Sequence, residues 1–346
     1  MDVYVGKSQV ETRQQAKLKH VDACLLPASQ YQKSAGFEHV TLEHQALAGL
    51  ALKDVSLATE FLGHKLAAPL MIAPMTGGME RGALLNRRFA RAAEHFGLAF
   101  GVGSQRLALE DPNVASSFRV RPFAKKALIF ANLGAAQLGM NGVVQCLRAV
   151  EMIEADALFI HLNPLQEACQ EHGDTDFSCV VESIAEAVQA LKARSIPVLV
   201  REVGFGLSEA SARALIGTGI SGIDCAGAGG TSWAKVEGLC ASSETYRSLG
   251  EVFGEWGIPT VQSINNVRNI DGNVPLIAAG GIRSGLDIAK SIALGANLAA
   301  MARPMLMAAI AGEHELFSFI EQVLLELRVA MFATGAKTVS ELRVGE

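Results

Sequence analysis

The stretch 161–167 holds four side chains suited to a charged substrate: His161, Asn163, Gln166 and Glu167. Because side chains alternate along an extended strand, His161 and Asn163 would point the same way. A histidine titrates near neutral pH, so it can transfer a proton or contact a phosphate. Glu167 offers a hard oxygen ligand for Mg2+, which proteins hold with few carboxylates plus substrate phosphates. The stretch predicts proton chemistry beside a phosphate-bearing ligand, the alternative being that Glu167 only pairs with a local cation.

Two glycine-rich turns predict a phosphate site elsewhere in the chain. They are 227–232 (GAGGTS) and 280–283 (GGIR). Glycine lets backbone N–H groups approach a phosphate closely, and the N-terminus of a following helix favours its charge. Glycine also makes plain tight turns, so the cation of Arg283 beside the second turn is what favours phosphate binding.

Eight short apolar runs must position these residues. They span 68–75, 98–104, 127–134, 157–163, 197–204, 222–227, 275–281 and 298–304. Segments with helical spacing, such as 86–95 and 180–193, lie between them. Strands that alternate with helices predict βαβ units and a parallel sheet, and eight such units close a barrel. An open doubly wound sheet is the alternative, but its G-x-G-x-x-G turn is missing after the first run.

The predicted fold class is therefore α/β, a (β/α)8 (TIM) barrel in a single domain, 1–346. We expect an N-terminal extension at 1–66 that caps the barrel or covers its mouth, the barrel at 67–312, and C-terminal helices at 313–346. Active sites of such barrels lie at the C-terminal ends of the strands. Polar residues gather at seven of these ends. A single polar residue there is often a helix cap, whereas seven ends together predict a site.

Composition narrows the class of protein. The net charge of −5 argues against a nucleic-acid-binding face. Every apolar run is shorter than the roughly 18 residues of a membrane span, and the first residues lack the apolar core of a signal peptide. The six cysteines are scattered without a C-x-x-C pair, so neither zinc nor a disulfide framework is expected. We expect a globular cytoplasmic protein that binds neither nucleic acid nor membrane.

The sequence motifs around these strand ends, taken in order along the chain, resemble those of type II isopentenyl-diphosphate isomerases, the FMN-dependent form. The resemblance covers nearly the whole chain from about Lys17, and three motifs carry most of it: GVGSQR (101–106), IHLNPLQE (160–167) and GAGGTSW (227–233). Further matches are MTGG (75–78), ANLGA (131–135), EVG (202–204), WGIPT (256–260) and GGIR (280–283).

The resemblance implies an enzyme that interconverts isopentenyl diphosphate and dimethylallyl diphosphate with reduced FMN and Mg2+, NADPH serving to reduce the flavin. It also implies a homo-oligomer, a tetramer or octamer. The residues expected around FMN are Met75, Thr76, Ser104, Asn132, Arg201, Thr231, Gly281, Arg283 and Ala302. Those expected at the prenyl diphosphate are Lys17, His20, Ser104, Gln105, Arg106, His161, Asn163 and Gln166, with Glu167 on Mg2+.

The same resemblance assigns the chemistry. The reduced flavin would donate and accept the proton, and Gln166, a neutral amide, would orient the alkene or relay a proton. For His161 we favour contact with the diphosphate over proton transfer.

Two residues depart from the family pattern. The family usually has adjacent Arg and Lys three residues before a His in the N-terminal segment, and here Ala16 replaces the Arg before Lys17 and His20. The usual Lys of the fifth strand is Arg201, which keeps the charge but has a different hydrogen-bonding fork.

Two alternative functions remain open on the sequence. One is an FMN-dependent hydroxy-acid oxidase, disfavoured because no histidine occurs between His172 and His314. The other is a non-catalytic flavin-binding paralogue, disfavoured by the intact IHLNPLQE stretch.

Overall fold

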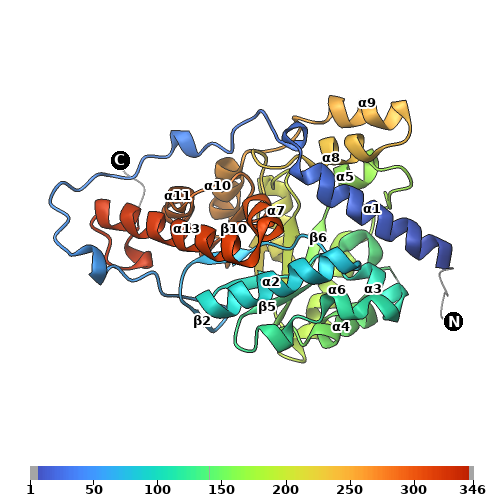
Figure 1. Cartoon of the computed structure of the whole chain (residues 1–346), viewed down its shortest axis with the longest axis horizontal. Helices are drawn as coiled ribbons and strands as arrows, with labels where there is room; N and C mark the ends of the chain where they lie inside the picture. Colours follow the sequence, from blue (N-terminus) through green and yellow to red (C-terminus); the bar gives the residue numbers. More distant parts are fainter. Residues whose placement is uncertain (1–6, 140, 343–346) are drawn as a thin grey trace.

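Eight parallel strands form a closed barrel in the computed structural model, which describes residues 7–139 and 141–342 (Figure 1). The order around the barrel is β10-β3-β4-β5-β6-β7-β8-β9. The strands are β3 (Leu70–Ile72), β4 (Ala99–Gly101), β5 (Ile129–Gly134), β6 (Ala157–Leu162), β7 (Val198–Glu202), β8 (Gly222–Asp224), β9 (Leu276–Ala279) and β10 (Leu298–Met301). Each strand lies inside one of the eight predicted runs, so the predicted barrel is confirmed.

Helices surround the barrel because each presents an apolar stripe to it. In α2 (Glu80–Phe96) the buried residues Leu85, Phe89 and Ala93 recur every four residues, which puts them on one face. The other helices of this layer are α3 (Arg106–Glu110), α4 (Gly142–Ile153), α5 (Pro164–Cys169), α6 (Val180–Lys192), α7 (Glu209–Gly217), α8 (Trp233–Cys240), α9 (Glu244–Val252), α10 (Thr260–Ile270), α11 (Gly285–Ala293) and α12 (Arg303–Ala311). Short 3-10 helices lie at 27–29, 37–39, 52–54, 112–118, 121–123 and 135–137.

The barrel interior is a packed apolar core with a polar layer above it. Phe130 and Phe159 stack inside with ring centroids 4.4 Å apart, while the alternate residue Leu158 packs outward in the helix-facing core. Two residues further along the same strands, the inward positions are Asn132 and His161. Strand alternation thus carries the polar side chains to the carboxyl end of the barrel.

Parts of the N-terminal extension lie at both ends of the barrel. An antiparallel hairpin of β1 (Thr59–Phe61) and β2 (His64–Leu66) packs Phe61 and Leu66 against the first interior residues of the strands and closes the lower end. At the opposite end, α1 (Lys7–Leu25) packs on α8 (Figure 1). The extension therefore contributes to the core as well as to the mouth.

The C-terminal segment forms one long helix, α13 (Glu313–Ala333), and a 3-10 turn at Val339–Glu341. The helix packs along α11 and α12 on the outside of the barrel. All six cysteines are free. Within residues 7–139 and 141–342, no helix combines the length and the apolar character needed to cross a membrane.

Candidate active site

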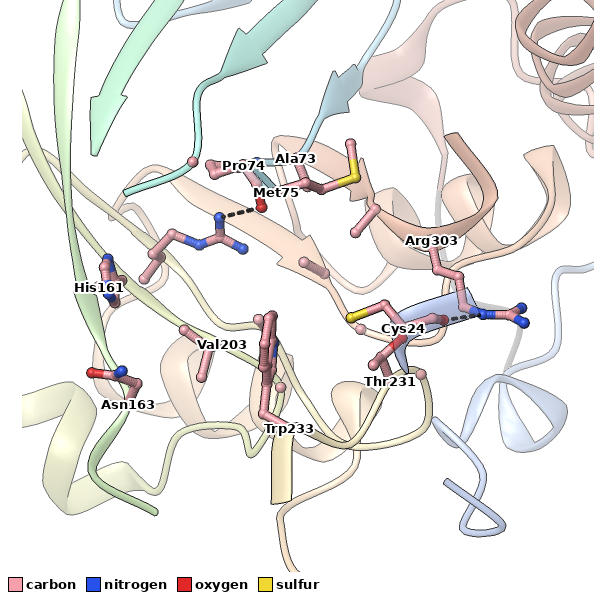
Figure 2. A pocket seen from close by; sticks show the side chains of 18 of the residues that line it. Cys24, Ala73, Pro74, Met75, His161, Asn163, Val203, Thr231, Trp233 and Arg303 are labelled. Carbon is pink, nitrogen blue, oxygen red and sulfur yellow. Dashed lines mark hydrogen bonds between the residues drawn. The ribbon is translucent and has the colours of Figure 1, made fainter. Parts of the chain in front are cut away.

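A cavity of about 310 Å3 lies at the carboxyl end of the barrel, under α1 (Figure 2). Its size is at the lower end of the range usual for ligand sites. All but one of the residues predicted from the sequence line it: Lys17, His20, Met75, Thr76, Ser104, Arg106, Asn132, His161, Asn163, Gln166, Glu167, Arg201, Thr231, Gly281, Arg283 and Ala302.

The exception is Gln105, which the sequence placed at the substrate. Its side chain is fully buried away from the cavity. The amide donates to the carbonyl of Ala149 at 2.9 Å and accepts from the backbone N–H of Asn132 at 3.0 Å. Gln105 is the N-cap residue of α3 and lies beyond the end of β4. The alternation of side chains between the two faces of a strand therefore does not predict where it points. In this geometry Gln105 does not line the cavity; it holds the backbone of Asn132.

His161 faces the cavity as a neutral imidazole. Burial, with repulsion from Arg201 and Lys17, lowers its pKa to about 3. The Asn132 amide donates from Nδ2 to the carbonyl of Val102 at 3.1 Å, which leaves its oxygen to accept from Nδ1 of His161 at 2.9 Å. Nε2 of His161 is then the unprotonated nitrogen. Before a ligand binds, His161 is thus a hydrogen-bond acceptor rather than a cation.

Asn163 and Glu167 form a buried polar pair at the start of α5. Asn163 donates from Nδ2 to one oxygen of Glu167 at 2.8 Å, and the backbone N–H of Asp174 donates to the other at 2.7 Å. The Oδ1 atom of Asn163 is buried and has no hydrogen-bond partner. Each Glu167 oxygen retains a free lone pair, since a carboxylate accepts about four hydrogen bonds. The pair can therefore present oxygen atoms to a cation.

The structure adds a carboxylate that the sequence analysis missed, Glu237 of α8. Its exposed fraction is 3%, and its two oxygens lie 2.8 Å from Nε2 of Gln166 and 3.1 Å from Nε2 of His20. The His20 ring also meets Trp233 edge to face, with centroids 5.7 Å apart. Glu237 thus joins α1 to Gln166. Glu237 lies within a helix rather than at the end of a strand. The sequence feature that could have indicated it is a carboxylate in the mostly apolar helix that follows GAGGTS.

Two cations lie at the α1 side of the cavity. Lys17 donates to the carbonyl of Ser104 at 3.0 Å and lies over the Phe118 ring. Burial lowers the pKa of Lys17 to about 8, with Glu110 opposing and Arg106 adding to the shift. Arg106 contacts the carboxylates of Glu110, at 3.0 Å, and Asp174. Arg106 is thus paired with two carboxylates, whereas Lys17 donates to a carbonyl and is the cation that an anion could recruit.

A backbone cradle lies across the cavity from these cations. A methyl group at Gly230 would stand 2.6 Å from the backbone nitrogen of Gly281, and Gly281 itself has φ +70°. Only glycine permits this close approach of two turns. Arg283 donates to the carbonyls of Gly229 and Gly281, at 3.2 and 3.3 Å, so its guanidinium lies at the same place. The cradle fits a phosphate group.

Several buried polar atoms between the cradle and His161 lack hydrogen-bond partners. They are Oγ1 of Thr76, Nε of Arg201 and Oδ2 of Asp224. Arg201 and Asp224 still form an ion pair at 3.4 Å, and the Arg201 guanidinium lies over the Phe159 ring. The Arg201 and Asp224 atoms are therefore partners of one another, and the Thr76 hydroxyl is the atom that indicates a polar ligand in the cavity, since buried polar groups are normally paired.

Comparisons with known proteins first define the class. The chain matches the model of the FMN-dependent dehydrogenase family over residues 27–125 and 164–345. Its fold resembles a flavocytochrome b2 variant with sulfite bound, at TM-score 0.68 and 16% identity over 97% of this chain and 84% of that one. A mandelate oxidase variant with a monooxide FMN adduct gives TM-score 0.61 and 19% identity over 93% and 91%. This is a barrel protein of the FMN-dependent dehydrogenase family.

Relatives of higher identity define the particular family. The chain is 44% identical to the isopentenyl-diphosphate delta-isomerase of Nostoc sp., over 95% of this chain and 94% of that protein. It is 47% identical to the protein of the same name from Cronobacter sakazakii, over 95% of both chains. The chain belongs to the isopentenyl-diphosphate delta-isomerase family, which confirms the resemblance.

Proposed function

We propose that this protein interconverts isopentenyl diphosphate and dimethylallyl diphosphate by adding one proton and removing another. The observation that carries the proposal is the cavity at the carboxyl end of the barrel, which brings His161 and Gln166 together with Lys17 and a phosphate cradle. Glu237 supports Gln166 from behind the cavity wall. A hydroxy-acid oxidase is disfavoured, since the likeness to solved oxidases lies below 20% identity and shows the fold alone.

FMN fits the cradle side of this cavity. The cradle at Gly230, Gly281 and Arg283 would hold its phosphate, and the unpartnered Thr76 hydroxyl and the Arg201 guanidinium, both of which line the cavity, would meet polar atoms of its ring. When bound and reduced, FMN supplies a ring that can give and take a proton. We propose NADPH as the source of its electrons and a homo-oligomeric assembly.

Lys17 and Arg106 would hold the diphosphate of the substrate, with Lys17 reaching it from α1. Glu167, with the unpartnered Asn163 oxygen beside it, fits Mg2+ shared with the diphosphate. A single carboxylate holds Mg2+ weakly, so metal and substrate would bind together.

The remaining polar residues would direct the proton. Glu237 fixes the amide of Gln166 by accepting from its Nε2, so Gln166 presents its side chain to the cavity in one orientation. The unprotonated Nε2 of His161 would accept a hydrogen bond from a ligand in the cavity. Burial of these groups under α1 would exclude water from the site of proton transfer.

The direct test is anaerobic turnover of isopentenyl diphosphate with FMN, NADPH and Mg2+, with the product identified by NMR. We expect dimethylallyl diphosphate, and none when FMN is omitted from flavin-free protein. Flavin binding without any isomer formed would support the non-catalytic paralogue instead.

Lys17 should control substrate affinity in a pH-dependent way. Its pKa of about 8 lies below the usual 10.5, so the free protein loses this charge as pH rises above about 8. Binding a diphosphate then requires proton uptake, and KM should rise with pH, by up to about tenfold per unit. Lys17→Arg should abolish this rise, because arginine stays charged. Lys17→Met should raise KM about ten- to a hundredfold at pH 7, the loss of one charged hydrogen bond.

Ala16→Arg serves as the companion variant, since it restores the cation usual in the family. We expect a lower KM with unchanged flavin affinity. If neither Lys17→Met nor Ala16→Arg changes KM, α1 does not contact the diphosphate.

Glu237→Gln should lower kcat about hundredfold, a typical loss when a group in proton transfer is removed or misplaced. The new amide replaces one acceptor oxygen with a donor, so Gln166 and His20 can no longer both be held. Glu244→Gln, an exposed change on α9, is the matched control. A kcat within threefold of the wild type, as an approximate margin, would show that Gln166 needs no such partner.

A further inference from the structure

Arg303, the first residue of α12, holds the C-terminal end of α1 (Figure 2). Its Nε donates to the carbonyl of Cys24 and its Nη2 to the carbonyl of Leu25, both at 2.8 Å. The last carbonyls of a helix lack partners within the helix, and a cation there also interacts favourably with the helix dipole. Arg303 therefore fixes the last turn of α1 from the barrel side.

The same residue lies at the phosphate end of the cavity. Arg303, its neighbour Ala302 and the cradle residue Arg283 all line this region. Burial lowers the pKa of Arg303, and repulsion from Arg283 lowers it further. Because Arg283 and Arg303 line the same cavity, an anion bound between or beside them would stabilise both guanidinium groups. A bound phosphate would thus hold both side chains in place.

The residues that α1 carries to the cavity lie just before this anchored end. Lys17 and His20 are eight and five residues before Leu25, within about two turns of helix. Their own contacts, with Ser104 and Glu237, are one hydrogen bond each. Movement of the last turn would displace both side chains from the cavity. The two bonds from Arg303 therefore add to the packing of α1 on α8 in placing the substrate-binding groups.

We propose that Arg303 is a positioning residue that couples phosphate binding at the cradle to the docking of α1 over the cavity. This inference rests on the proposed function, because FMN supplies the phosphate. A phosphate at the cradle holds Arg283 and Arg303 in place, and Arg303 in turn holds Cys24 and Leu25. Cofactor binding would then prepare the substrate site before the substrate arrives.

Hydrogen exchange of the α1 backbone amides, measured with and without FMN, tests the coupling. In the wild type, saturating FMN should slow exchange in the last two turns of α1 about tenfold, the scale of one charged hydrogen bond. Riboflavin, which lacks the phosphate, should protect the barrel rim but leave α1 exchange unchanged. The Arg303→Lys variant should still bind FMN, yet α1 should no longer respond, because lysine lacks the two-pronged fork.

Arg268→Lys is the matched control. Arg268 also donates from Nε and Nη2 to a backbone carbonyl, that of Gly295, at 3.0 and 2.8 Å, but at the lower end of the barrel. This variant should keep the full response of α1 to FMN. Equal protection of α1 by FMN and riboflavin, or an undiminished response in Arg303→Lys, overturns the inference alone. Failure of the wild type to bind FMN overturns the proposed cofactor and this inference with it.

Discussion

Replacing Glu167 with glutamine should lower turnover at least about hundredfold while flavin content stays at the wild-type level, since metal-site changes commonly cost that much. The new amide carries no charge to bind Mg2+. Its NH2 group would also face one of the two donors that Glu167 now accepts from, the backbone N–H of Asp174 at 2.7 Å or Nδ2 of Asn163 at 2.8 Å. The expected signature is loss of activity together with loss of saturation by Mg2+ in the millimolar range.

The matched control for this change is Glu182→Gln, an exposed carboxylate in the first turn of α6. It should leave activity, Mg2+ dependence and flavin content unaltered. Full activity of Glu167→Gln with the wild-type Mg2+ dependence would show that the metal binds elsewhere.

Adding one methyl group at Gly230 should weaken FMN binding about hundredfold or more, because charged hydrogen bonds to phosphate contribute about 1.5–3 kcal/mol each. The added carbon would lie 2.6 Å from the backbone nitrogen of Gly281. Gly230→Ala must therefore open the cradle or displace the phosphate. Flavin fluorescence titration of the apoprotein measures the affinity.

Riboflavin and a second glycine separate this local effect from general damage. Riboflavin affinity should change little in Gly230→Ala, since riboflavin has no phosphate to place in the cradle. Gly217→Ala, at the end of α7, adds a methyl group with nothing within 4 Å and should alter neither flavin's binding. An equal loss of FMN and riboflavin affinity in Gly230→Ala would mean that the cradle does not hold the phosphate.

The barrel was predictable because its strands are buried on both faces. Each strand reads as a short apolar run between glycines or polar residues, and β5 is buried at every position. The same regularity predicted that His161 and Asn163 would point the same way, and both line the cavity. Alternation along a strand is a local property, so it can be read without knowledge of the fold.

Residues beyond the strand ends were less predictable. Gln105 follows a turn that redirects its side chain into the layer beneath the cavity, where it contacts Ala149. Glu237 reaches the site only because α8 packs beneath α1, a contact between segments more than 200 residues apart in the chain. Neither residue lies in a local sequence pattern that predicts where its side chain points. The packing of distant segments, rather than local secondary-structure propensity, determines where both side chains lie.

The hairpin at Thr59–Leu66 illustrates the same limit. Its strands are three residues each, too short for a periodic pattern, and they form by pairing with one another under the barrel. Burial of Phe61 and Leu66 against the barrel interior stabilises them, and that surface exists only once the barrel has closed.

The ratio of product formed to NADPH consumed tests the central claim most directly. An isomerase that moves a double bond makes no net oxidation, so NADPH is needed only to reduce the flavin. In anaerobic D2O with limiting NADPH, the proposed function predicts many molecules of dimethylallyl diphosphate for each NADPH oxidised, with deuterium incorporated into the product. Consumption of NADPH in proportion to the substrate converted, or recovery of unlabelled isopentenyl diphosphate alone, would contradict it.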